Sequence, residues 1–245
     1  MPVKDLLLAK KWFGFDLDDT LHEFRKASSN AALEIFADIE AKYDVDILSL
    51  QPSYVQILKK TTSGAFTDGR TSAEYRQERF SALLKEFNIN YTNNYVDELV
   101  EKYKFALQSA LTLKPGALEL LRHLRETGKH VIVITEGPAD AQKWTVHELG
   151  LEPYVNVLVT TNETGKSKVD GLIAEVLRLH QIPAQDMVYI GDNEARDIVP
   201  ARQVGVLAIH YNEMENSQLD VEPLRTQSLE TLRILMESRL EKNSP

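Results

Sequence analysis

Short apolar runs alternate with amphipathic segments over most of the second half of the chain. The runs typical of buried strands lie at 12–15, 130–134, 155–159, 187–190 and 206–209. Segments whose apolar positions recur near the 3.6-residue period of a helix lie at 115–127, 138–149, 169–180, 195–203 and 229–240. Strands that alternate with helices predict an α/β fold, a doubly wound, Rossmann-like parallel sheet.

The stretch between 24 and 111 has a different pattern, because its apolar positions repeat only at helical spacing, as in Leu99, Tyr103 and Leu107. This stretch is too long for a simple crossover between two neighbouring strands, so we predict an inserted helical cap domain. The expected boundaries are an α/β core at 1–20 and 113–245 and a cap at 21–112.

Composition narrows the class of protein. The chain has 245 residues and a formal net charge of -9, so nucleic-acid polymers and anionic membranes are not expected partners. It has no cysteine, which excludes disulfides and thiolate nucleophiles. No apolar run reaches the length of a membrane span, and the one near the N-terminus is too short for a signal peptide. We therefore expect a cytoplasmic protein.

Acidic side chains follow two of the predicted strands. Asp16 and Asp18 come directly after 12–15, and Asp192 and Asp197 come after 187–190. In an open parallel sheet the ligand crevice lies at the carboxyl ends of the strands, so these carboxylates converge. Several like charges in one place require a cation, and carboxylate oxygens suit Mg²⁺.

A phosphorylated ligand suits the same edge of the sheet. Beside a bound metal, Asp16 can act as a nucleophile towards phosphorus. Asp18, two residues on, can protonate the leaving oxygen and later activate water. Thr135 and Glu136 follow the 130–134 strand and therefore reach the same crevice.

The order of these residues resembles the haloacid dehalogenase-like hydrolase (HAD) superfamily over nearly the whole chain. Its first motif, D-x-D-x-T, is present at 16–20, and its fourth, G-D-x(3 or 4)-D, at 191–197. Its second motif, a Thr or Ser that ends the second strand, corresponds to Thr135. The resemblance implies the doubly wound core and the phosphoryl chemistry described above.

The third motif of the superfamily is a lysine ahead of a later helix, and two lysines compete for it. Lys168 is preferred to Lys166 because 168–170 keeps the frame of the Lys-Pro-Asp that is frequent in the family. Val169 stands where that pattern has proline.

The resemblance also implies a role for each residue. Asp16 is expected to be the nucleophile and Asp18 the general acid and base, while Thr135, Glu136 and Lys168 face the phosphoryl group. The expected Mg²⁺ ligands are Asp16, the backbone carbonyl of Asp18, Asp192 and, directly or through water, Asp197.

The subclass follows from two features. True dehalogenases of the superfamily lack an acid at the position of Asp18, so the resemblance favours a phosphatase. The insertion implies a helical C1-type cap, and its 64–80 segment is similar to nucleotide phosphatases, which makes Arg70 a candidate substrate contact. The expected substrate is a small phosphorylated metabolite such as a nucleoside monophosphate or sugar phosphate.

Two alternatives stay open at this point. A phosphomutase or phosphotransferase would use the same Asp16 and pass the phosphoryl group to an acceptor other than water. A receiver-like signalling module would also phosphorylate an aspartate beside Mg²⁺, but such modules have neither a second aspartate at the position of Asp18 nor a helical insertion.

Overall fold

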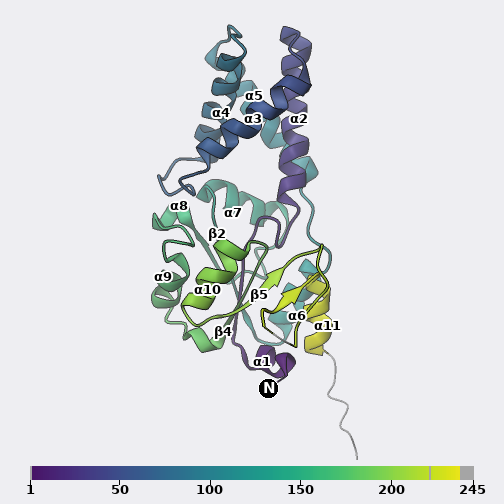
Figure 1. Cartoon of the computed structure of the whole chain (residues 1–245), viewed down its shortest axis with the longest axis vertical. Coiled ribbons are helices and arrows are strands. Elements are labelled where there is room, and N and C mark those ends of the chain that lie inside the picture. The colour runs from purple at the N-terminus through teal and green to yellow at the C-terminus, as the bar shows by residue number, and fades with distance from the viewer. Residues whose placement is uncertain (1, 221, 238–245) are drawn as a thin grey trace, which may run out of the picture.

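A helical unit stands on one end of an α/β unit in the computed structural model, which describes residues 2–220 and 222–237 (Figure 1). The strands are β1 Trp12–Phe15, β2 His130–Thr135, β3 Val157–Thr160, β4 Met187–Gly191, β5 Leu207–Tyr211 and β6 Arg225–Thr226. The helices are α1 Val3–Ala9, α2 Phe24–Tyr43, α3 Ile47–Thr61, α4 Ser72–Glu86, α5 Asn93–Ala110, α6 Ala117–Glu126, α7 Ala139–Glu148, α8 Thr161–Thr164, α9 Leu172–Leu179, α10 Val199–Gln203 and α11 Leu229–Glu237. A 3₁₀ turn, η1 Ala184–Asp186, and a π-helix, η2 Glu194–Ile198, complete the described elements.

The sheet is parallel throughout the described residues, with strand order β3-β2-β1-β4-β5-β6. This order confirms the predicted doubly wound α/β fold. Strand β1 is central, and Phe15 lies beside Val133 of β2 and Ile190 of β4. The residues that follow β1, β2 and β4 therefore leave the sheet at neighbouring points of one edge.

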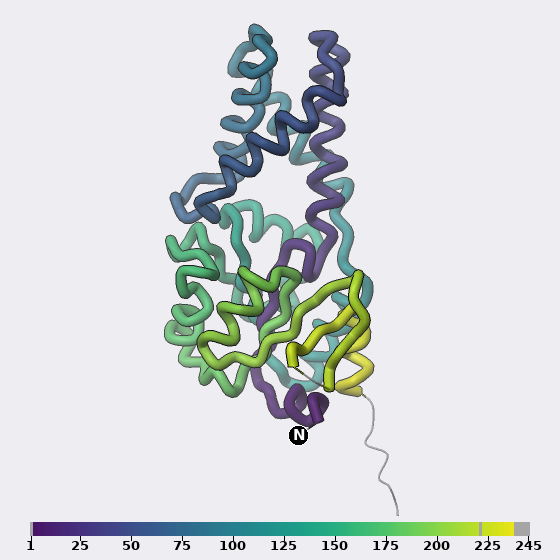
Figure 2. The backbone as a smooth tube through the Cα atoms, viewed as in Figure 1, coloured from purple at the N-terminus to yellow at the C-terminus, as the bar shows by residue number. Residues whose placement is uncertain are grey.

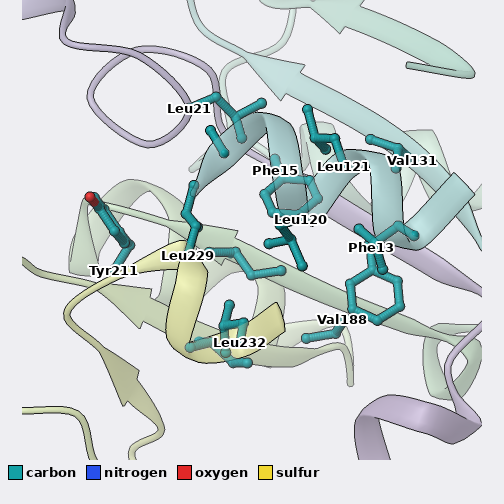
Figure 3. Packing of buried hydrophobic residues seen from close by; sticks show 14 of the residues in the cluster. Phe13, Phe15, Leu21, Leu120, Leu121, Val131, Val188, Tyr211, Leu229 and Leu232 are labelled. Atoms are coloured by element: carbon teal, nitrogen blue, oxygen red, sulfur yellow. The ribbon is translucent and has the colours of Figure 1, made fainter. Parts of the chain in front are cut away.

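The two faces of the sheet are covered by different helices because successive side chains of a strand point to opposite faces. Phe13 and Phe15 pack with residues of α6 and α11 on one face (Figure 3). Met187 and Tyr189 pack with residues of α9 and α10 on the other. Strands β2 and β4 contribute side chains to the packing on both faces, and they are apolar at consecutive positions. This pattern is expected for a sheet that is buried on both faces.

The inserted helices α2 to α5 have a hydrophobic core of their own, built from residues between Ala27 and Leu107. The chain enters and leaves this cap through two adjacent linkers, which run side by side up from the core (Figure 2). The Glu23 amide donates to the Thr112 carbonyl at 2.9 Å, and the Lys114 amide donates to the Leu21 carbonyl at 2.9 Å. The cap is thus tied to the sheet through a paired backbone neck.

Some elements differ from the sequence prediction. Helix α1 and strand β6 were not predicted, because seven residues are too few for a clear helical period and two residues too few for a strand pattern. The helix predicted at 195–203 begins with the π-helical turn η2, and the one predicted at 169–180 begins only at Leu172. The last part of the predicted 229–240 helix, 238–240, lies outside the described residues. No helix of the described chain is long and apolar enough to cross a membrane.

Gly14 in the middle of β1 leads to a stability prediction. A Cβ at this position would lie 2.2 Å from Met187 Cε and 2.7 Å from the Tyr189 ring. Tyr189 is held in place by hydrogen bonds of its hydroxyl, so Gly14→Ala should lower the free energy of unfolding by about 1–3 kcal/mol, a typical cost of overpacking.

Urea unfolding followed by circular dichroism measures this change. Gly64→Ala is the matched control, because nothing lies within 4 Å of a Cβ at Gly64, and it should shift stability by no more than about 0.5 kcal/mol. Equal stability of the two variants would show that the β1–β4 contact tolerates a methyl group.

Candidate active site

The loop after β1 brings two carboxylates into one cavity. The Asp16 amide donates to the Ile190 carbonyl at 2.9 Å, which extends the β1–β4 ladder by one residue. The chain then folds back, with Asp19 in the left-handed region at φ 63° and a backbone bridge between Asp18 and His22. Asp16 and Asp18 both line the resulting cavity, as the sequence spacing predicts.

Lys168 joins the ends of two strands. Its Nζ lies 2.5 Å from Asp16 Oδ1 and 2.5 Å from Asp197 Oδ1, and its side chain is 3% exposed. The Lys168 amide donates to Glu136 Oε1 at 2.8 Å, which fixes the loop before α9 against the end of β2. Lys166 instead points outward and pairs with Glu175. The structure therefore brings Lys168 into the site and leaves Lys166 outside it.

Asp197 is held by the segment that follows β4. Its Oδ2 accepts from the Asn193 amide at 3.1 Å, and the Tyr189 hydroxyl lies 3.3 Å from its Oδ1. A Cβ on Gly191 would lie 2.5 Å from Asp197 Cβ, so only glycine lets η2 approach the strand this closely. This contact is the physical reason for the glycine in the Gly-Asp motif.

Asp18 has two partners that the sequence analysis did not identify. His22, fully buried, lies with Nε2 2.8 Å from Asp18 Oδ1, and Gln142 Nε2 lies 3.4 Å from Asp18 Oδ2. Gln142 also accepts from Thr135 Oγ1 at 3.2 Å. The carboxylate of Asp18 is thus oriented from both sides. The four-residue spacing of Asp18 and His22 was the only sequence signal for this contact.

The carboxylates give the site an excess of negative charge. The pKa of Asp16 is raised to about 8, first by burial and also by the neighbouring Asp197 and Asp18, against the opposing effect of Lys168. Burial also raises the pKa of Asp192, with Asp197 acting in the same direction and Arg25 against it. Burial on its own would lower the pKa of Lys168, but Asp16 and Asp197 raise it well above its ordinary value, so the ammonium stays charged.

The donor atoms fit a hard divalent cation. Asp16, Asp192 and Asp197 each offer a carboxylate oxygen, and these oxygens lie within 4.8 Å of one another. An all-oxygen set with room for water is the environment that Mg²⁺ prefers. Arg25 Nη2 lies 2.7 Å from Asp192 Oδ2, so a guanidinium shares one of these carboxylates.

A cavity of about 310 Å³ lies between the core and the cap. Its core side carries the acidic cluster, Thr135, Glu136 and Lys168, so the structure brings these predicted site residues together. Its cap side includes Arg76 and Arg79 of α4. Arg70 is not among the described residues that line it, because its guanidinium pairs with Asp68 and Glu78. The predicted role of Arg70 as a substrate contact therefore has no support from the geometry.

The fold and the site together define a class of hydrolase, with a cap between β1 and β2 and acidic residues after the strands. Comparison with known proteins gives the same class. Residues 10–205 match the family model of the haloacid dehalogenase-like hydrolases. The chain belongs to this family. Membership argues against the receiver-like alternative.

Three similar proteins share about a quarter of their residues with this chain or fewer. The chain is 27% identical to a ribulose-1,5-bisphosphate 5-phosphatase of Halopiger xanaduensis, over 83% of this chain and 85% of that enzyme. It is 26% identical to the pyrimidine 5'-nucleotidase PynA of Streptococcus pneumoniae, over 82% and 84%. The magnesium-bound structure of the HAD-hydrolase YfnB of Bacillus subtilis is similar in fold, with a TM-score of 0.71 and 22% identity over 94% of this chain and 99% of that one.

Metal binding can be tested apart from activity. Asp192→Asn removes a charged oxygen ligand, so the Mg²⁺ dissociation constant should rise by at least about 10-fold in isothermal titration calorimetry. Glu152→Gln, a charge-matched control at an exposed pair with His147, should bind Mg²⁺ like the unmodified protein. Unchanged affinity in Asp192→Asn would contradict a metal site at these carboxylates.

Proposed function

We propose that this protein is a Mg²⁺-dependent phosphomonoester hydrolase that forms an aspartyl-phosphate on Asp16. The observation that carries the proposal is the juxtaposition of two aspartates with separate environments in one cavity. Asp16 contacts the Lys168 ammonium, whereas Asp18 contacts a histidine and an amide. These environments support a division of roles in which Asp16 acts as the nucleophile and Asp18 carries a proton.

In the first half of the reaction, an Asp16 oxygen attacks phosphorus and the bond to the ester oxygen breaks. Lys168 and Thr135 offset the charge on the phosphoryl oxygens as it develops. Asp18 gives its proton to the departing alkoxide. In the second half, Asp18 takes a proton from water, which attacks the aspartyl-phosphate and releases inorganic phosphate.

The metal ligands in this proposal are Asp16, Asp192, the Asp18 carbonyl and, directly or through water, Asp197. Bound Mg²⁺ would polarise the phosphoryl oxygens and reduce the repulsion between them and the Asp16 carboxylate. His22 and Gln142 keep Asp18 turned towards the cavity while this happens. The YfnB structure, which was bound to magnesium, supports the choice of metal.

The substrate class in this proposal is a small phosphorylated metabolite. A cavity of about 310 Å³ suits such a molecule. Two of the relatives named above act on a sugar bisphosphate and on pyrimidine nucleotides, which are both phosphate esters of a five-carbon sugar but differ in the rest of the molecule. We therefore carry over the reacting group and not the rest of the substrate.

Transfer to another acceptor is the alternative that uses the same Asp16. A phosphomutase or phosphotransferase would release little inorganic phosphate and would depend on a bisphosphate activator. Phosphate release that continues over many turnovers without such an activator would argue for hydrolysis.

The first test of the proposal is phosphate release from a panel of phosphomonoesters. Release should require Mg²⁺, stop with EDTA, and fall about 10⁴-fold in Asp16→Asn, because the amide is not a nucleophile towards phosphorus. Glu152→Gln, at the exposed pair with His147, controls for loss of charge. Activity of Asp16→Asn near that of the unmodified protein would rule out the aspartyl-phosphate.

A second test addresses Asp18. Asp18→Asn should lower the turnover of alkyl phosphates by about 10²–10⁴-fold, the usual contribution of a general acid. The loss for p-nitrophenyl phosphate should be much smaller, because its leaving group needs little protonation. Steady-state kinetics on both esters measures the difference, and equal losses would contradict the acid role.

A further inference from the structure

Two arginines on α4 form part of the cap wall of the cavity, three residues apart on one side of the helix. Arg76 is only 8% exposed. Across residues 2–220 and 222–237, its guanidinium has no hydrogen bond or ion pair, and its described contact is the face of the Tyr103 ring, 5.0 Å from Cζ. An arginine side chain this far removed from bulk water normally has an anionic partner.

Arg79 is in a similar position. Its Nε donates to Thr61 Oγ1 at 2.9 Å, but its Nη2 is buried without a hydrogen-bond partner. Its other neighbours are the rings of Phe66 and Tyr75, 5.9 and 5.5 Å from Cζ. Burial lowers the pKa of Arg79, and the Arg76 charge adds to this effect, yet arginine remains protonated in proteins.

The surrounding groups do not neutralise these two charges. The other arginines at the cavity, Arg25 and Arg196, pair with Asp192 and Glu136 respectively. The ring that Arg76 contacts belongs to Tyr103, and burial raises the pKa of its phenol, so the phenol stays uncharged. Aromatic faces stabilise a cation only weakly compared with a carboxylate or phosphate.

We propose that Arg76 and Arg79 bind a second anionic group of the substrate, a phosphate or a carboxylate distinct from the phosphoryl group that Asp16 attacks. The inference rests on the proposed phosphatase function and narrows its substrate class to bisphosphates or phosphorylated carboxylic acids. Guanidinium groups suit this task because their planar donors match two oxygens of either anion. A nucleoside monophosphate, which has no second anionic group, should then be a poorer substrate.

A different role for the same arginines makes a different prediction. If Arg76 and Arg79 only offset the acidic cluster of the core, their removal would affect every phosphoester alike. If they bind a second anion, their removal would affect only substrates that carry one. Substrate pairs that differ in this single group separate the two roles.

The experiment compares glycerol 3-phosphate with 3-phosphoglycerate, and fructose 6-phosphate with fructose 1,6-bisphosphate. The unmodified protein with Mg²⁺ should show kcat/KM about 10- to 100-fold higher for the doubly anionic member of at least one pair. The carboxylate pair and the phosphate pair identify which anion is preferred. Absence of a preference in both pairs, with p-nitrophenyl phosphate hydrolysed, would overturn the inference and leave the phosphatase proposal intact.

The variants Arg76→Met and Arg79→Met should each remove most of this preference and change p-nitrophenyl phosphate turnover by less than about 3-fold. Lys85→Met is the matched control, because it removes an exposed cation from the same helix and should keep the preference. Circular dichroism confirms that each variant is folded. An equal loss on p-nitrophenyl phosphate would contradict the inference in favour of the general electrostatic role.

A binding measurement separates the two proposals. Calorimetric titration of 3-phosphoglycerate and glycerol 3-phosphate into Asp16→Asn needs no turnover. Tighter binding of 3-phosphoglycerate, lost in Asp16→Asn/Arg76→Met, would support the second-anion site even if no ester were hydrolysed. Equal binding within this pair, and also of fructose 6-phosphate and fructose 1,6-bisphosphate, would count against it.

Discussion

One buried ammonium determines how the acidic end of the sheet is organised. Lys168 lies between Asp16 and Asp197, and all three side chains are less than a tenth exposed. Carboxylates this close together and this far from water would repel one another strongly without a cation among them. Because Asp16 follows β1 and Asp197 follows β4, the lysine also ties together two strands and the loop before α9.

Two glycines make this contact possible, because a Cβ at either position would clash with a neighbouring residue. Gly14 makes room for the Tyr189 ring, whose hydroxyl donates to the Ile134 carbonyl at 3.0 Å and lies close to Asp197. Gly191 makes room for Asp197 itself. The charge pattern of the site therefore depends on packing within the strands, two residues before Asp16 and one residue before Asp192 in the chain.

The core of the site was predictable because its residues follow strands directly. Asp16, Thr135 and Asp192 come straight after apolar runs, so the parallel topology alone brings them together. The frame of 168–170 also selected the correct lysine for the cavity. His22 was not identified from the sequence, because a lone histidine gives no sign of its partner. The cap arginines were equally ambiguous in sequence, since only the folded chain shows that Arg70 is paired with acids.

The acidic cluster and the arginines of the cap wall belong to separate parts of the molecule. The acidic cluster is fixed by the sheet, whereas the two arginines of the cap wall belong to α4. The N-terminal Ser72 of this helix donates through its amide and its hydroxyl to Asp140 of α7. Because the linkers and this contact hold the cap against the core, α4 can change its side chains without moving Asp16. If the proposed function holds, the reacting phosphoryl group is specified by residues that belong to sequence motifs. The rest of the substrate is then specified by cap residues, and only the folded chain shows which of their charges are left unpaired.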